Sequence, residues 1–213
     1  MPKRSPIASD IAFTPAVRAI QARKGSRAAY ARMEERGGWS ATITPDLAAF
    51  IASQTSAFLG TANGAGQPYI QHRGGPPGFL QVQDARALAF ADFRGNRQFI
   101  TQGNLAENPQ AHLFLIDYAT RQRVKLWGTA RVVEDDPALV ARLLPPDCKA
   151  TSEQAIVFRV SAWDANCPRR IPRRLDAASV AAAIEARDRR IAELEAEIAR
   201  LVHLPVRQDP GSS

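Results

Sequence analysis

The spacing of hydrophobic residues changes twice along the chain and separates helical from strand-like parts. Near each end, apolar residues recur every three or four positions, as on one face of an α-helix. In the middle, short apolar runs stand between turn-forming glycines and prolines, which is typical of β-strands. The pattern predicts a helical N-terminal arm (1–43), a β domain (44–163), an Arg/Pro-rich connector (164–175), an amphipathic helix (176–204) and a flexible tail (205–213).

The β domain is expected to open with a short helix at Thr44 and Pro45, because threonine caps helices and proline suits their first position. A Gly-rich turn at 63–66 predicts a hairpin, and helices over 95–105 and 137–144 interrupt the later strands. Six or seven short strands favour a small antiparallel barrel with flanking helices. The expected strands are 56–62, 68–73, 79–83, 87–92, 112–118, 122–134 and 155–163.

The long helix behind Asp176 carries a heptad seam. Its apolar residues are spaced by 4, 7, 3, 4 and 3 positions, and Arg187 occupies the one missing seam position. Such a seam either pairs with a second copy of the helix or packs on its own protein, and the sequence leaves both open. The seam residues are Val180, Ile184, Ile191, Leu194, Ile198 and Leu201.

Composition excludes several classes of protein. The 213 residues are 45% hydrophobic and 23% charged, as in ordinary globular proteins. The net charge of +7 is concentrated in residues 1–38, with 8 basic and 3 acidic groups, so we expect no nucleic-acid partner. The longest apolar run, 47–52, is far below the roughly 18 residues of a membrane span. With no secretory signal at the N-terminus, we expect a cytoplasmic protein without a membrane partner.

Cysteine and histidine usage points away from metal and hydrolase chemistry. Cys148 and Cys167 lack metal-ligand spacing, so we interpret them as reduced thiols and expect no metal site. His72 and His112 have no acidic partner at catalytic spacing and are interpreted as structural. No Ser-His-Asp, HExxH or paired-carboxylate pattern is present in the sequence, so nothing supports a hydrolase.

The run DFRGNRQFITQGNLAENP, residues 92–109, is the most informative motif. A strand leads through a glycine turn into a helix, so Gly95, Asn96 and Arg97 are expected at a helix N-terminus, where backbone N–H groups favour an anion. The guanidinium of Arg97 suits a phosphate. Spacing alone also allows Asn96 to be a simple cap and Arg97 to pair with a carboxylate, since helix caps are common.

Two further segments bear candidate binding residues. QHRGGPPG, residues 71–78, forms a stiff loop that could bring backbone close to a ligand, with Arg73 as a second cation; a rigid connection between strands explains it as well. It lacks the Lys-Ser/Thr of a nucleoside-triphosphate loop. In 121–128, Gln122 could bond a flat polar-edged ring, or the segment is a solvated edge strand.

In their order, PYIQHRGGPPGF, FADFRGNRQFITQGNLAENP and RQRVKLWGTARVVED resemble the pyridoxamine 5'-phosphate oxidase-related family of FMN-binding split-barrel proteins, over about residues 44–163. The resemblance implies a six-stranded antiparallel Greek-key split barrel and a homodimer. It also implies FMN held in grooves between the two subunits.

Carried over residue by residue, Asn96 and Arg97 match the family's Ser-Arg pair at the FMN phosphate, and Gln122 matches the glutamine beside the isoalloxazine. Arg73 falls near a phosphate-binding arginine. The expected cofactor-binding set is Gln71, Arg73, Phe93, Asn96, Arg97, Gln98, Gln122 and Arg123.

The chain departs from the family in three places. Ser-Arg-Lys becomes Asn-Arg-Gln at 96–98, which removes a cation for which Arg73 is expected to compensate. The lysine that closes the family's Arg-x-Val-Leu-Leu-Lys run is absent, and Gln81 is nearest to its place. The family's substrate-binding Arg-x-His pair is replaced by Arg174-Leu175-Asp176, which argues against oxidation of pyridoxamine phosphate.

These features predict an FMN-dependent oxidoreductase that moves a hydride or electrons between FMN and a small molecule or reduced nicotinamide. Because the flavin performs the electron transfer, no protein acid or base need be found. The alternative is a non-catalytic flavin-binding or interaction protein that uses helix 176–204 as a docking surface.

Overall fold

The computed structural model describes residues 6–145, 151–165 and 169–202. The chain divides into two compact units: residues up to Asp117 together with Arg121–Ile171, and Tyr118–Thr120 together with the chain from Pro172 onward. Cys148, Cys167 and the predicted tail lie outside the described residues, so the expectation of reduced thiols stays a prediction.

The first unit is built around one antiparallel sheet of seven strands, one more than the resemblance implied. They pair in the order β2-β1-β5-β6-β7-β4-β3, so β2 and β3 form the two edges of a split barrel. The short β3 pairs with β4 and lies where the strand 79–83 was expected. The bounds are β1 Ser56–Ala62, β2 Pro68–Gly74, β3 Gln81–Asp84, β4 Ala87–Phe93, β5 Gln110–Asp117, β6 Gln122–Val133 and β7 Ser152–Ala165.

Helices begin where local signals place them. Thr14, Thr44 and Asp136 each accept a hydrogen bond from the backbone N–H three residues on, and each is followed by proline. The starts predicted at Thr44–Pro45 and at residue 137 are confirmed. The helices are η1 Ala8–Ile11 (a 3₁₀ turn), α1 Pro15–Arg23, α2 Arg27–Glu35, α3 Pro45–Ser53, α4 Ile100–Glu107, α5 Pro137–Leu143 and α6 Ala177–Val202.

The core lies inside the barrel. Phe79, Phe90 and Phe158 are almost completely buried there, and Ile51 of α3 closes one side. Phe79 was expected in a strand, but it precedes β3 and packs as a core residue instead. The N-terminal arm packs on β6 through Trp39, whose ring stacks on Trp127 at 4.8 Å between centroids.

One predicted helix begins later than expected, and this changes the interpretation of its motif. The helix expected from Gly95 starts at Ile100. Arg97 and Phe99 have φ of 59° and 54°, in the left-handed region, which no α-helix can continue through. Gly95, Asn96 and Arg97 therefore lie in a loop, and the argument from a helix N-terminus is wrong for them.

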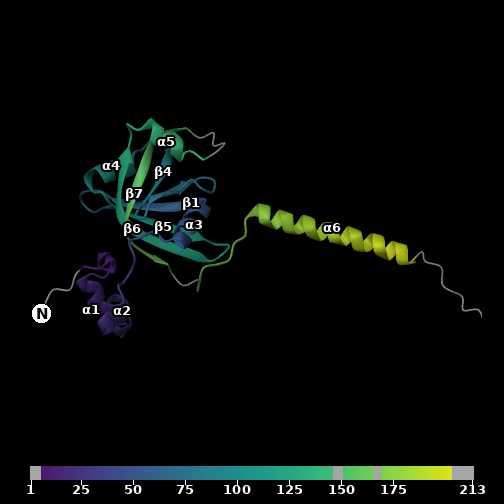
Figure 1. The fold of residues 1–213 in the computed structure, drawn as a ribbon, viewed down its shortest axis with the longest axis horizontal. Coiled ribbons are helices and arrows are strands. Elements are labelled where there is room, and N and C mark those ends of the chain that lie inside the picture. The colour runs from purple at the N-terminus through teal and green to yellow at the C-terminus, as the bar shows by residue number, and fades with distance from the viewer. Residues whose placement is uncertain (1–5, 146–150, 166–168, 203–213) are drawn as a thin grey trace, which may run out of the picture. The chain divides into compact units, whose positions relative to one another are not determined.

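The second unit is dominated by α6, an uninterrupted helix of 26 residues (Figure 1). Asp176 caps it as predicted, since its Oδ1 accepts a hydrogen bond of 2.8 Å from the N–H of Ser179. No helix in the described part of the chain is long and apolar enough to cross a membrane.

Candidate functional site

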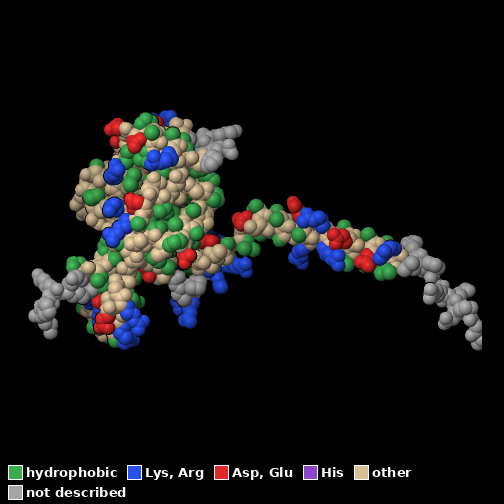
Figure 2. Space-filling view, in the orientation of Figure 1, with side chains coloured by type: hydrophobic (Ala, Val, Ile, Leu, Met, Phe, Trp, Pro, Cys, Tyr) green, Lys and Arg blue, Asp and Glu red, His purple; other side chains and the backbone are tan. Residues whose placement is uncertain are grey.

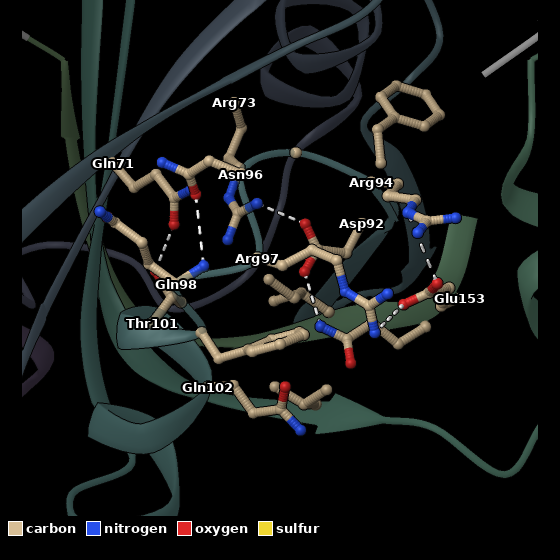
Figure 3. A pocket seen from close by; sticks show the side chains of 16 residues that line it. Gln71, Arg73, Asp92, Arg94, Asn96, Arg97, Gln98, Thr101, Gln102 and Glu153 are labelled. Carbon is tan, nitrogen blue, oxygen red and sulfur yellow. Dashed lines mark hydrogen bonds and ion pairs between the residues drawn. The ribbon is translucent and has the colours of Figure 1, made fainter. Parts of the chain in front are cut away.

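A pocket forms where the edge strand β2 approaches β4 and the loop 94–99. Figure 3 shows Gln71, Arg73, Asp92 and Arg97 gathered around it. The cavity volume is about 70 Å³, below the roughly 300–1,000 Å³ typical of small-molecule sites. The lining residues are Gln71, Arg73, Asp92, Phe93, Arg94, Gly95, Asn96, Arg97, Gln98, Phe99, Thr101, Gln102, Val132, Glu153, Gln154 and Ile156.

A second hollow of about 160 Å³ lies beside the first and shares Gln71, Arg73, Asp92, Phe93 and Gly95 with it. The two hollows therefore meet at Arg73 and Asp92. A ligand seated at this pair could extend to either side.

Arg73 and Asp92 form a buried ion pair at the centre of the site. Nη1 of Arg73 donates to Oδ1 of Asp92, and each side chain is 12% exposed. Oδ2 of Asp92 accepts a hydrogen bond of 2.7 Å from Gln154. Burial lowers the pKa of the Arg73 guanidinium, and the nearby Asp92 carboxylate opposes this effect. The Asp92 carboxylate thus offsets part of the free-energy cost of burying the charged Arg73 side chain.

The pair leaves one donor of Arg73 unused. Its Nε is buried and has no hydrogen-bond partner in the described structure. Most buried polar groups in proteins are satisfied, so this donor leaves room for one further acceptor, as do Ser9 Oγ and Arg18 Nε elsewhere in the chain. An anion in the hollow would supply that acceptor.

Helix α4 is fixed to the sheet by two hydrogen bonds between side chains. Thr101 Oγ1 donates to Gln71 Oε1 at 2.6 Å, and Asn104 Nδ2 donates to Thr61 Oγ1 at 3.0 Å. Thr61, Thr101 and Asn104 are all buried, so the Asn104–Thr61 bond forms away from water, whereas the Thr101–Gln71 bond is partly buried. They hold the start of α4, and with it the end of the loop 94–99, against β1 and β2.

The two arginines of the loop 94–99 make only long ion pairs with the rest of the site. Nη2 of Arg97 lies 3.8 Å from Oε2 of Glu153, and Nε of Arg94 lies 3.9 Å from Oε1 of the same carboxylate. All three side chains are about half exposed, so these ion pairs are weak. The alternative in which Arg97 pairs with a carboxylate therefore matches this structure. The pairing is weak enough for Arg97 to exchange Glu153 for a ligand.

Asn96 does not cap α4, whose N-cap is Phe99, so the expectation of a simple helix cap at Asn96 is wrong. Its side chain instead makes a local turn contact within the loop. Oδ1 of Asn96 accepts a hydrogen bond of 3.4 Å from the backbone N–H of Gln98. With three arginines against two carboxylates, the lining of the first hollow carries a net charge of +1.

Six of the eight predicted cofactor-binding residues line the pocket: Gln71, Arg73, Phe93, Asn96, Arg97 and Gln98. Gln122 and Arg123 do not, since they stand at the start of β6, ten residues before the lining residue Val132. At about 3.3 Å per strand residue, that is about 33 Å away along the strand. Within one chain, the two groups do not meet.

Sequence reasoning missed Asp92, Thr101, Glu153 and Gln154 as members of the site. Asp92 had a usable signal, because it is the one charged residue in the apolar strand ALAFADF. Glu153 and Gln154 had none, since β7 joins the site by pairing with β4 some 60 residues earlier. Gln81, nearest to the family's missing lysine, instead donates to the carbonyl of Leu143 and does not line the pocket.

Comparison with known proteins gives the family. The family model described as pyridoxamine 5'-phosphate oxidase matches residues 43–202. No match was found among curated proteins.

Similar solved structures include HupZ from Group A Streptococcus, 15% identical over 58% of this chain and 93% of that chain, with a TM-score of 0.48. A putative pyridoxamine 5'-phosphate oxidase from Lactobacillus delbrueckii is 16% identical over 59% and 95%, with a TM-score of 0.45. An FMN-binding protein from Syntrophomonas wolfei is 10% identical over 68% and 97%, with a TM-score of 0.46. Because the family model spans most of the sequence, the chain belongs to the pyridoxamine 5'-phosphate oxidase family.

Proposed function

We propose that the protein is an FMN-binding oxidoreductase and that the pocket at Arg73 and Arg97 holds the flavin phosphate. The observation that carries the proposal is that Arg73, whose buried Nε has no hydrogen-bond partner, lines the same hollow as Arg97. Membership of the family supports it.

The donor set fits a phosphate monoester. Arg73 and Arg97 supply two guanidinium groups, and the side chains of Asn96 and Gln98 supply neutral donors on the same loop. Charge-assisted hydrogen bonds from arginine to phosphate are among the strongest in proteins. Since Asp92 and Glu153 offset two of the three positive charges, we expect moderate rather than very tight binding.

The small cavity of one chain does not enclose a flavin ring, so we propose that a second copy completes the site. The outer face of the sheet suits such a contact. Ile70 is 70% exposed, and Phe58 and Phe114 lie beside each other on adjacent strands. Gln122 and Arg123, distant from the pocket within one chain, are then proposed to reach the cofactor bound to the other.

When bound, FMN supplies the hydride or electron transfer, and the protein binds, orients and limits access. The substrate is proposed to be a small molecule, with reduced nicotinamide as a donor. Pyridoxamine phosphate is not proposed, because Asp176 stands where the family has histidine and is used as the cap of α6. Arg174 lies over the ring of Tyr118, with 4.6 Å between Cζ and the ring centroid.

The test is the visible absorption spectrum of the purified protein before and after addition of FMN, followed by desalting. We expect flavin bands to remain with the native protein and to be lost or strongly reduced in Arg97→Ala. The control Arg131→Ala removes an exposed arginine of β6 that does not line the pocket, and should retain flavin. Absence of flavin from the native protein after desalting would overturn the proposal.

A second measurement separates the enzyme from a non-catalytic flavin carrier. Reduced nicotinamide added to the loaded protein without oxygen should bleach the flavin bands. Bound flavin that stays oxidised with reduced nicotinamide and with other physiological donors would favour the carrier.

A further inference from the structure

Helix α6 exposes an apolar seam that is interrupted once, at Arg187. None of its residues is buried, and the six seam residues are between 40% and 59% exposed. A helix with an uncovered apolar stripe gains most of its stability from packing, so this surface requires a partner. The seam consists of Val180, Ile184, Ile191, Leu194, Ile198 and Leu201.

We propose that α6 forms a parallel, in-register, two-stranded coiled coil with α6 of a second copy of this chain. The apolar seam lies outside the pocket proposed for flavin, so this proposal does not depend on flavin binding. Coiled-coil dimers and split-barrel dimers are both two-fold symmetric, so one dimer can contain both contacts.

The seam has the residue types of a parallel dimer. Numbered as heptads, the a positions are Ile184, Ile191 and Ile198, and Leu194 and Leu201 occupy d positions. Isoleucine at a with leucine at d favours two parallel strands over trimers or tetramers.

The width of the stripe favours a second helix over the surface of a barrel. A helix that packs on a globular core has apolar residues at a, d and also e or g, whereas a strict a/d stripe is the narrower seam of a coiled coil. In the middle of α6 the flanking positions are charged, with Asp188 and Glu195 at e and Arg190 and Glu197 at g. Figure 2 shows acidic and basic side chains among hydrophobic ones along the helix.

The charges select the parallel orientation. In a parallel pair, a g residue of one helix lies opposite the e residue of the next heptad in the other helix. Arg190 of each copy then faces Glu195 of the other, giving two attractive pairs. In the antiparallel arrangement of largest overlap, Arg190 faces Arg190 and Asp188 faces Asp188, which is repulsive.

Arg187 is the weak point of the seam. It occupies a d position, so an in-register parallel pair places it opposite Arg187 of the other copy, which lowers stability. Asp188 at the neighbouring e position of each helix borders this layer and offsets part of the repulsion between the two guanidinium groups. The in-register alignment is favoured because it overlaps all six apolar seam residues, whereas a shift by one heptad leaves part of the seam uncovered.

Disulfide trapping in the full chain tests the proposal. The two native cysteines are replaced by serine, and Leu194→Cys is oxidised with oxidised glutathione. In the proposed pair, the two introduced thiols lie opposite each other at d, so we expect a covalent dimer on a non-reducing gel. Ile191→Cys at a repeats the test, and Glu193→Cys on the outer face is the control that should remain largely uncrosslinked.

The outcomes are distinct. If α6 packs on its own chain, Leu194→Cys and Ile191→Cys stay monomeric on the gel, which overturns the proposal. If the pair is antiparallel, Leu194→Cys crosslinks only when mixed with Ile184→Cys, which also overturns it. Arg190→Glu should lower the crosslinking rate, and the double variant Arg190→Glu/Glu195→Arg should restore it. An equal rate in all three would contradict the charge pairing.

Discussion

Arg73 on β2 pairs with Asp92 on β4, although these two strands share no backbone hydrogen bonds. The ion pair therefore connects the two sides of the split in the barrel. It lies at the point where both hollows meet. One contact thus links two non-adjacent strands and positions the cation that we assign to the ligand.

Asp92→Asn should make stability depend on anions. Removing one partner of a buried ion pair costs about 3–5 kcal/mol, because the other charge is left uncompensated. In phosphate-free buffer we expect a loss of unfolding free energy of that size, measured by urea denaturation. Added inorganic phosphate or FMN should recover part of it by neutralising Arg73.

The control is Asp164→Asn, which removes a carboxylate that pairs with Lys125 at 2.9 Å, away from the pocket. That pair is more exposed, so its loss should cost at most about 1 kcal/mol and should not respond to phosphate. An equal loss for Asp92→Asn with and without phosphate would contradict the assignment of Arg73 to an anion.

Thr61→Val should destabilise the attachment of α4. The hydroxyl of Thr61 is the acceptor for the buried amide of Asn104, and an unsatisfied buried amide costs about 1–3 kcal/mol. Replacing both residues, with Thr61→Val and Asn104→Leu, should cost less than the sum of the two single changes, since neither polar group remains. If urea denaturation gave strictly additive losses of unfolding free energy, the hydrogen bond would not couple Thr61 and Asn104.

Gly128→Ala should be among the most damaging changes of a single methyl group. A Cβ at this position would lie 2.0 Å from the backbone oxygen of Arg159, at the irregular point of the β6–β7 pairing. We expect a loss of more than about 2 kcal/mol or a failure to fold. Gly103→Ala in α4 meets nothing within 4 Å and should be neutral or stabilising by up to about 1 kcal/mol. Comparable melting temperatures for the two variants would contradict this account.

His112 should make stability fall in mild acid. Burial, and secondarily the charge of Lys125, lowers the pKa of His112 below its ordinary value of about 6.5. The unfolded chain then binds the proton more readily than the folded one. The contribution of neutral His112 to the free energy of unfolding is complete above pH of about 6.5. It is lost as the pH falls through the pKa that His112 has in the folded chain.

The measurement is the unfolding free energy of the native protein and His112→Gln between pH of about 5 and 8. The difference between the two proteins should change with pH in the acidic part of this range and be constant in the alkaline part. A constant difference throughout would show that His112 does not titrate differently on folding. Its ring packs edge-on against Trp127 at 4.9 Å, so the comparison at alkaline pH also measures this contact.

Local features were predictable from the sequence because their causes lie within a few residues. Thr14, Thr44 and Asp136 each cap the helix that follows because the capping oxygen reaches an N–H only three residues away. The loop 94–99 was not predictable in this way. Arginine and phenylalanine rarely adopt positive φ, so nothing in the local pattern indicated that the helix would start only at Ile100.

Residues of the site were predictable from the sequence where they lie in the segments that resemble the family. Arg73 and Arg97 were identified and do line one pocket. Glu153 was not predictable as the partner of Arg97, because it joins the site through a strand pairing far along the chain. Asp92, the partner of Arg73, by contrast stood out as a charge in an apolar strand and was missed. Whether Gln122 joins the same site depends on a second copy, which no pattern within one chain specifies.

The most direct measurement compares the affinities of FMN and riboflavin, which differ only by the phosphate, by calorimetric titration of the native protein and Arg97→Ala. We predict that the native protein binds FMN at least about tenfold more tightly than riboflavin, which corresponds to about 1.4 kcal/mol. In Arg97→Ala that preference should shrink, with riboflavin affinity unchanged. Equal affinities of the native protein for the two flavins, or no binding of either, would contradict a phosphate site at Arg73 and Arg97.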